Sequence, residues 1–262
     1  MMMYEICSQT DQGRLRKNNE DAVAFDAQTG LCLLADGMGG YNAGEVASGM
    51  AVAFISLELG RWLSQFDSQA SAREIRRTME ICVENVNHSI FNAACSNHDY
   101  EGMGTTLVVA VFQEGRLVLG HIGDSRCYRL RGQVFQQITK DHSLLQEQVD
   151  AGLMTPEQAL TAPHKNLITR ALGVDEVVSV EINEHRVELG DVYMMCSDGL
   201  SDMVRDAAMA AILGAPGTLQ QKALLLVAAA NEAGGRDNIS VVLVRAAEDT
   251  TRRGLVSRIL GK

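Results

Sequence analysis

The sequence lacks the features that would mark a membrane protein, a secreted protein or a zinc protein. Its six cysteines are widely scattered and form no CxxC pair, which argues against a zinc site or a disulfide framework. No apolar run approaches the roughly 18 residues that a membrane span needs. The start, MMMYEICSQTDQG, has neither the basic region nor the apolar stretch of a secretion signal. We therefore expect a cytoplasmic protein with no membrane span.

Proline and positive charge are also scarce. Only Pro156, Pro163 and Pro216 occur, and no Ser/Gly-rich linker divides the chain, so we expect one domain over residues 1–246. Residues 247–262 form a basic, mildly amphipathic tail, which is more typical of a frayed terminus than of a docking segment. The net charge of −10, without a dense basic patch, argues against nucleic acid as a partner. We expect a monomer.

Short apolar runs rich in β-branched residues predict buried strands. The tripeptide QEG at 113–115 separates two of them and is typical of a hairpin connection. The runs are LCLLA (31–35), TTLVVAVF (105–112), RLVLGHIG (116–123), VYMMCS (192–197) and ISVVLV (239–244).

Helical periodicity occupies other parts of the chain. Apolar residues recur every three to four positions over 43–63 and 71–97, and a third helix is predicted over 218–233. Ser71 and Glu74 have the spacing of a capping box. Neighbouring strands joined by short turns, with helices before and after them, indicate an α+β fold with antiparallel sheets rather than a βαβ winding.

Four aspartates stand at the ends of apolar strands: Asp36, Asp124, Asp198 and Asp237. If these ends converge, they concentrate negative charge, because two carboxylates about 4 Å apart repel by roughly 4 kcal/mol at an effective dielectric near 20. Such a cluster must be protonated, paired or bound to cations. Oxygen ligands without cysteine or histidine suit Mg²⁺ or Mn²⁺.

Other interpretations of these residues exist. Asp-Gly is a common turn dipeptide, so any one of the sites taken singly is more typical of a turn. The stretch GMGGYNAG also invites comparison with a dinucleotide-binding loop. From Gly37, however, the third glycine of that motif would fall at position 42, which is Asn42, and Asp36 would repel a pyrophosphate.

The motifs, taken in order, resemble the metal-dependent Ser/Thr phosphatases of the protein phosphatase 2C type. The resemblance covers nearly the whole chain and is closest to the bacterial stand-alone form. Seven stretches carry it: RKNNED (16–21), DGMGG (36–40), GTTLVVA (104–110), GDSRCYRLR (123–131), HKNLITRALG (164–173), CSDGL (196–200) and GGRDNISVVLV (234–244).

The resemblance implies an αββα sandwich, in which two antiparallel sheets are flanked by helix pairs. It implies two Mn²⁺ or Mg²⁺ ions in a core site, with Asp36 bridging them, the Gly37 carbonyl on one ion, and Asp198 and Asp237 on the other. A water held between the ions would attack the phosphoryl group. By the same resemblance, Glu20 and Asp21 would hold metal-bound waters, and Asp21 would be close enough to count as a metal-site residue. Asp124 would join Asp198 at a third, weaker ion. Arg16 would bind the substrate phosphate.

One position departs from the pattern of many eukaryotic members. They carry histidine after the Asp-Gly pair, proposed as the acid that protonates the leaving group, whereas this chain carries Met38. The acid is therefore unassigned; metal-bound water, His142 and His164 are candidates, although the two histidines are more typical of structural or surface positions. Residues 141–173 correspond to the family's flap, which we expect to form short mobile helices beside the site. Arg126 and Arg170 fit an ion-pair role and a phosphate-binding role equally well.

The resemblance implies hydrolysis of phosphoserine and phosphothreonine in proteins. It also implies a role in signal transduction, in which the enzyme opposes a bacterial Ser/Thr kinase and acts on that kinase and its substrates. Two alternatives stay open: a binding module of the same fold without metals, and a relative that acts on phosphoserine in anti-sigma-antagonist proteins. The residues do not identify the physiological substrate.

Overall fold

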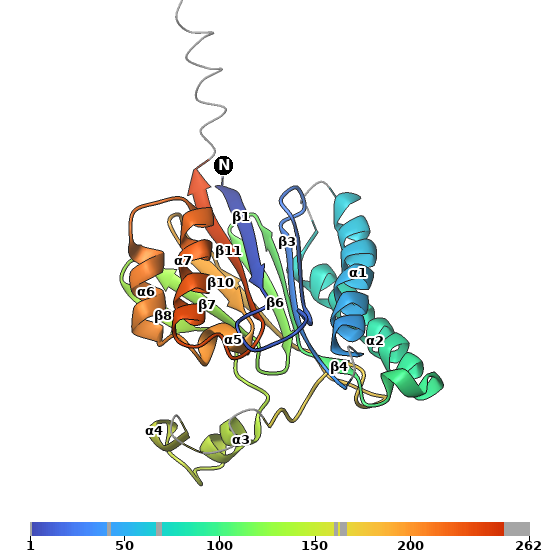
Figure 1. Ribbon diagram of the computed structural model, residues 1–262. Coiled ribbons are helices and arrows are strands. Elements are labelled where there is room, and N and C mark those ends of the chain that lie inside the picture. The colour runs from blue at the N-terminus through green and yellow to red at the C-terminus, as the bar shows by residue number, and fades with distance from the viewer. Residues whose placement is uncertain (1, 41–42, 67–69, 160–161, 163–166, 249–262) are drawn as a thin grey trace, which may run out of the picture.

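The computed structural model describes residues 2–40, 43–66, 70–159, 162 and 167–248. Figure 1 shows two β-sheets packed face to face, with α1 and α2 covering one outer face and α6 and α7 covering the other. The layers run helix, sheet, sheet, helix, so the expected αββα sandwich is confirmed. The short helices α3 and α4 lie apart from these layers, beyond one end of the strands.

Both sheets are antiparallel. The sheet next to α6 and α7 has the order β1 (Met2–Asp11), β11 (Ile239–Glu248), β10 (Val192–Cys196), β7 (Arg126–Arg131) and β8 (Val134–Gln137). The sheet next to α1 and α2 has the order β2 (Asp21–Asp26), β3 (Leu31–Met38), β5 (Leu107–Gln113), β6 (Arg116–Ile122) and β9 (Glu181–Arg186), and the short β4 (Gly104–Thr105) pairs with the end of β3.

The predicted strands are all present, with different ends. Strand β3 continues through Asp36 and Gly37 to Met38, because β4 pairs with its last two residues. The run 105–112 is therefore divided between β4 and β5, with Thr106 between them. The hairpin at 113–115 is confirmed: Glu114 and Gly115 connect β5 to β6 with φ values of 48° and 77°, as a two-residue primed turn requires.

The three predicted helices are confirmed as α1 (Ala43–Ser64), α2 (Ala72–Ser96) and α7 (Leu219–Glu232). Ser71 and Glu74 form the predicted capping box at the start of α2. The apolar α6 (Asp206–Gly214) was not predicted, and neither were the short α5 (Asp198–Ser201) and the 3₁₀ turn η1 (His98–Tyr100).

Helix α1 is apolar around its circumference because it packs on β3, β2, β4 and α2 at once. Its length and mean hydropathy of 1.3 would also suit a membrane span. Its buried residues instead belong to the core cluster between the helix pair and the β3 sheet, where Ile55 and Leu59 are fully buried. The packing therefore accounts for the apolar composition of α1.

The central strands β3, β5, β6, β10 and β11 bury both faces, which explains their continuous apolar runs. In β10, Val192, Met194 and Cys196 face the α6–α7 layer, whereas Tyr193 and Met195 face the opposite sheet. Burial of a side chain of this size contributes about 1.5–3 kcal/mol. The candidate site residues lie at the ends of these packed strands.

The segment predicted as the flap contains α3 (Leu144–Asp150) and α4 (Pro156–Ala159). Its beginning and end are joined by the isolated bridge between Ser143 and Ile168. A second bridge pairs Leu172 with Thr105, next to the end of β3. The flap is therefore anchored at its base to the strand end that carries Asp36. The predicted tail lies outside the described residues from position 249 onward.

Candidate metal centre

The strand ends that carry the predicted aspartates converge. Asp36 is half-buried, and its pKa is raised well above the usual range by desolvation first, and then by Asp21, Asp198, Asp124 and Asp237 in that order. Pairing of β2 with β3 places Asp21 directly opposite Asp36. The structure thus brings together the predicted carboxylates from elements far apart in the sequence.

Asp36 is held through its backbone. Its N–H donates to Thr106 Oγ1 at 3.0 Å, and its carbonyl oxygen accepts from Thr106 N and from Thr105 Oγ1, both at 2.9 Å. Thr106 Oγ1 also shares a hydrogen bond with Ser125 Oγ at 2.7 Å. Since Ser125 follows Asp124, the two threonines connect the backbone of Asp36 with the turn that carries Asp124.

Gly37 has a structural reason to be glycine. A Cβ at this position would lie 2.1 Å from the backbone oxygen of Gly44 in the first turn of α1 and 2.6 Å from the Glu20 carbonyl oxygen. Gly37 N also donates to that Glu20 oxygen at 3.1 Å, and Ser48 Oγ donates to it at 2.6 Å. The close approach brings Glu20 and α1 against the loop after Asp36.

Asp198 begins α5 directly after β10, and Asp237 precedes β11. The segments that follow Asp198 and Asp237 pack closely against each other. A Cβ at Gly199 would lie only 2.0 Å from the Asn238 carbonyl oxygen, so only glycine fits there. The pKa of Asp198 is raised well above its usual range, by burial first and then by Asp124 and Asp237. Asp198 therefore lies close enough to both Asp124 and Asp237 to interact with them electrostatically.

The two carboxylate oxygens of Asp21 have different surroundings. Its Oδ2 accepts from Ser197 Oγ at 2.8 Å, whereas Oδ1 is buried and has no hydrogen-bond partner among the described residues. Burial raises the pKa of Asp21 to about 6. A buried carboxylate oxygen without a donor is costly unless it is protonated or bound to a cation.

Arg16 is a positive side chain that forms an ion pair with this carboxylate cluster, through Asp237. Its Nη2 donates to Asp237 Oδ2 at 2.6 Å, and its side chain is 49% exposed. The ion pair raises the pKa of Arg16, and Glu20 and Asp36 add smaller contributions. Arg16 thus lies at the edge of the site, with about half of its side chain exposed.

Asn238 is a site residue that the sequence analysis missed. It is buried, its Oδ1 accepts from Glu20 N at 2.8 Å, and its Nδ2 donates to the Gln12 and Asn18 carbonyl oxygens at 2.9 and 2.8 Å. Asn238 therefore fixes the 12–20 loop that carries Arg16. Its position beside Asp237 was the available signal, but hydrogen bonds across about 220 residues leave no pattern in the sequence.

Asp124 follows β6 and is 9% exposed. Burial raises its pKa to about 6, and Asp141 is the next largest cause. Asp202 also acts on the pKa of both Asp124 and Asp198. Asp202 was not predicted, although it lies four residues after Asp198 and hence one helical turn away.

The other basic and polar candidates have different surroundings. Arg126 forms a two-pronged ion pair with Asp141, with Nη2 to Oδ2 at 2.6 Å, so its role is structural. Arg170 is exposed, and His164 lies outside the described residues. His142 is buried and hydrogen-bonded to the backbone of Gly123, which makes it a structural residue rather than an acid at the surface of the site. Met38 offers no proton.

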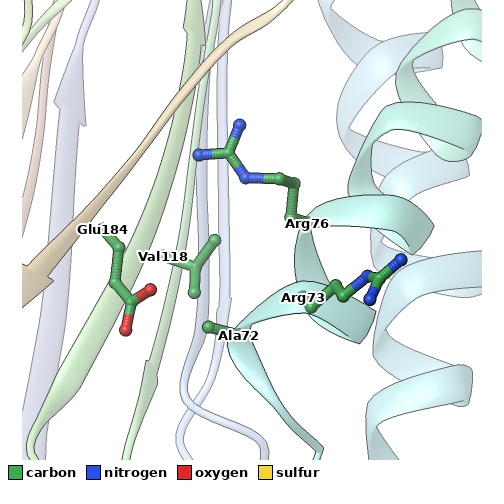
Figure 2. Close-up of a pocket in the computed structure, with 5 residues that line it drawn as sticks. All are labelled: Ala72, Arg73, Arg76, Val118 and Glu184. Atoms are coloured by element: carbon green, nitrogen blue, oxygen red, sulfur yellow. The ribbon is translucent and has the colours of Figure 1, made fainter.

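A cavity of about 220 Å³ lies elsewhere, between the start of α2 and the strands β6 and β9. In Figure 2, Arg73 and Arg76 extend from α2 on one side, and Val118 and Glu184 lie on the sheet side. Arg76 Nη2 donates to the Ile182 carbonyl oxygen at 2.5 Å, which ties α2 to the edge strand β9. None of the converging aspartates lines this cavity.

The converging residues fit divalent cations. They supply oxygen ligands only, including the buried Asp21 Oδ1 without a partner among the described residues, and burial together with neighbouring carboxylates raises the pKa values of Asp21 and Asp36. Hard cations such as Mg²⁺ and Mn²⁺ prefer such ligands. The donor set therefore fits the ions that the sequence analysis predicted.

Comparisons with known proteins agree with this geometry. The sequence profile of protein phosphatase 2C matches residues 12–221. The serine/threonine phosphatase stp of Listeria monocytogenes is 40% identical over 94% of this chain and 96% of its own length. The S. agalactiae serine/threonine phosphatase structure matches with a TM-score of 0.85, 38% identity, and coverage of 94% of this chain and 100% of its own. The catalytic domain of the phosphatase PstP, solved with two manganese ions, matches with a TM-score of 0.82 and 37% identity over 95% of this chain and 100% of its own.

Proposed function

This chain belongs to the protein phosphatase 2C family and is a protein serine/threonine phosphatase, and from that premise we propose that it uses two Mn²⁺ or Mg²⁺ ions, with a third, weaker ion at Asp124. The observation that carries the proposal is the buried Asp21 Oδ1, which lies opposite Asp36 and has no hydrogen-bond partner in the part of the chain that the structure describes. Such an oxygen is costly to bury unless it is protonated or bound to a cation, and we assign a cation to it at neutral pH.

Each predicted residue has a distinct task in this proposal. Asp36 would help to hold the core ions, since it interacts electrostatically with Asp21, Asp198, Asp124 and Asp237, and the Gly37 carbonyl would add a backbone ligand. Asp198 and Asp237 would hold the second ion, and Asp198 would share the third with Asp124. Asp21 belongs to the metal site, and Glu20 orients the loop around it.

When bound, the ions lower the pKa of water and neutralise the phosphoryl oxygens. Arg16 positions the phosphate, since its planar guanidinium can donate two parallel hydrogen bonds to two phosphoryl oxygens. Its contact with Asp237 keeps the guanidinium aimed at the edge of the site. His142 is buried, and burial lowers its pKa to about 4, so this side chain is not the acid that protonates the leaving group.

The protein substrate lies across the open edge of the site, beside the flap. The base of the flap pairs with Thr105 next to Asp36, so α3 and α4 can contact the residues that flank a phosphoserine or phosphothreonine. We take a bacterial Ser/Thr kinase and its substrates as the targets, in the cytoplasm, with the enzyme acting in signal transduction as a monomer. The six free cysteines suit a reducing compartment.

A metal-dependent phosphatase assay tests the proposal. Phosphoserine, phosphothreonine and phosphotyrosine peptides are incubated with purified protein in Mn²⁺, Mg²⁺ or EDTA, beside the Asp36→Asn variant. We expect turnover of the first two peptides with either ion, little of the third, and none in EDTA or with the variant. Equal turnover of all three peptides in EDTA would contradict the proposal.

A further inference from the structure

A second cluster of polar side chains lies at the base of the flap, beside the turn that carries Asp124. His121, His142 and Glu181 each offer one potential ligand atom, and these atoms lie within 4.8 Å of one another. The two imidazole rings stack with their centroids 4.7 Å apart and their planes 14° from parallel. By composition alone this cluster resembles a metal site of two histidines and one carboxylate.

The hydrogen bonds exclude a metal there. The Gly123 N–H can only donate, and it donates to His142 Nδ1 at 3.1 Å, so Nδ1 carries no proton. Neutral His142 therefore carries its proton on Nε2, the atom that faces Glu181 Oε2 at 3.6 Å, and a protonated nitrogen cannot bind a metal. His121 Nε2 lies 2.8 Å from the Lys140 carbonyl oxygen, which can only accept, so His121 likewise carries its proton on Nε2. Only two ligand atoms remain.

The same hydrogen bonds give His142 another role. It holds Gly123 from two sides: the His142 ring accepts from Gly123 N, and His142 N donates to the Gly123 carbonyl oxygen at 2.9 Å. Gly123 has a φ of 100°, and a Cβ there would lie 2.7 Å from the Thr106 side chain, so the turn has little room to move. Asp124 follows directly.

We propose that His142 is a positioning residue that fixes the Gly123–Asp124 turn and so sets the carboxylate of the third cation site. The inference rests on the proposed function, because the third ion belongs to it. The His142 carbonyl oxygen also accepts from Thr169 N at 2.9 Å, on the returning strand of the flap. His142 thus connects Asp124 to both ends of the flap base.

Two substitutions of similar shape separate this role from general stability. Asparagine places Oδ1 at the same number of bonds from Cβ as His142 Nδ1, so His142→Asn keeps an acceptor for Gly123 N. His142→Leu has nearly the same shape and no acceptor. His185→Leu is the matched control, since His185 is a partly buried histidine on β9 whose Nε2 has no hydrogen-bond partner among the described residues.

The experiment measures Mn²⁺ binding by calorimetry and, in metal-free protein, hydrogen exchange of the Gly123 amide. Loss of one buried acceptor should weaken the third Mn²⁺ site about tenfold and speed the exchange of Gly123 about tenfold in His142→Leu, with the two tight sites unchanged. His142→Asn should stay within about threefold of wild type in both measurements. His185→Leu should match wild type.

Normal third-site affinity and normal Gly123 exchange in His142→Leu would overturn the role of His142 alone. So would a defect that His142→Asn does not restore or that His185→Leu shares. A wild-type protein that binds only two Mn²⁺ ions would overturn the third site itself, and the proposal with it. If His142→Leu does not fold, His142→Gln replaces it, because its amide lies one bond beyond the Nδ1 position; normal third-site binding in that variant would also overturn the proposal.

Discussion

Replacing Asp124 with asparagine should stabilise the metal-free protein at pH 8, although it removes a proposed metal ligand. Asp124 is 9% exposed, and burial with Asp141 nearby raises its pKa from 3.8 to about 6. At about 1.4 kcal/mol for each tenfold change in proton affinity, this difference corresponds to about 3 kcal/mol. Asparagine has the same shape and no charge, so the variant avoids this cost of ionisation.

The direction of the pH dependence follows from the raised pKa. The folded protein binds the Asp124 proton more tightly than the unfolded chain does, so this group stabilises the fold fully below pH 3.8 and loses that effect as the pH rises through about 6. Urea unfolding in EDTA should therefore show the Asp124→Asn variant about 3 kcal/mol more stable than wild type at pH 8. The two proteins should be nearly equal at pH 4 or below.

Asp175→Asn is the control, because Asp175 is an exposed carboxylate outside the cluster. It removes one negative charge from the same net charge of −10 and should change the free energy of unfolding by less than about 0.5 kcal/mol. Equal stability of wild type and Asp124→Asn at pH 8, or the same gain at pH 4, would refute the reasoning. Saturating Mn²⁺ should remove most of the difference, since a bound cation stabilises only the wild-type carboxylate.

Three further predictions concern the site. Asp36→Asn should lose nearly all turnover at any Mn²⁺ concentration, and Asp237→Asn should be close to inactive. Asp124→Ala should still bind two ions by calorimetry but turn over substrate slowly. An Asp36→Asn enzyme with near-normal turnover would contradict the assigned roles. Arg16→Ala should raise KM for a phosphopeptide more than it lowers kcat, with partial rescue by Arg16→Lys, and steady-state kinetics showing an unchanged KM in both would remove Arg16 from the site. Asn238→Leu should also raise KM and should lower the free energy of unfolding by about 3 kcal/mol, because three backbone groups of the 12–20 loop lose their hydrogen-bond partner. Gln220→Leu, on the exposed side of α7, is the control. Equal urea midpoints for wild type and Asn238→Leu would count against the role of Asn238.

The sequence predicted the elements whose signals are local. The runs at 31–35 and 239–244 became β3 and β11, and Ser71 with Glu74 formed the capping box, because burial and capping depend on neighbouring residues. The helix α6 was missed, since its composition, DAAMAAILG, is apolar on nearly every side and shows no clear periodicity. The sandwich itself came from the resemblance, because pairings such as β1 with β11 join residues more than 200 positions apart.

In the site, too, the sequence predicted local features but not contacts between distant residues. The sequence marked the aspartates at strand ends, but their convergence depends on β2 pairing with β3 and on close backbone contacts at Gly37 and Gly199. Asn238 was missed because it acts on a loop far away in the sequence, whereas Asp202 stands one helical turn after Asp198 and could have been found from that spacing. The tautomer of His142 could be inferred only after the Gly123 N–H was located.

The fold accepts this concentration of charge because it fixes the backbone and leaves the carboxylates for cations. Asp36 is held by Thr105 and Thr106 through main-chain atoms, so its side chain is not consumed by the hydrogen bonds that position it. Arg16 neutralises one oxygen of Asp237 but comes from a loop, which is easier to displace than a strand. The raised pKa values of Asp21 and Asp124 have the same consequence: below about pH 6 protons compete with cations for these oxygens, and above it the repulsion among the carboxylates favours cation binding. The instability of the metal-free site is therefore part of its affinity for metal.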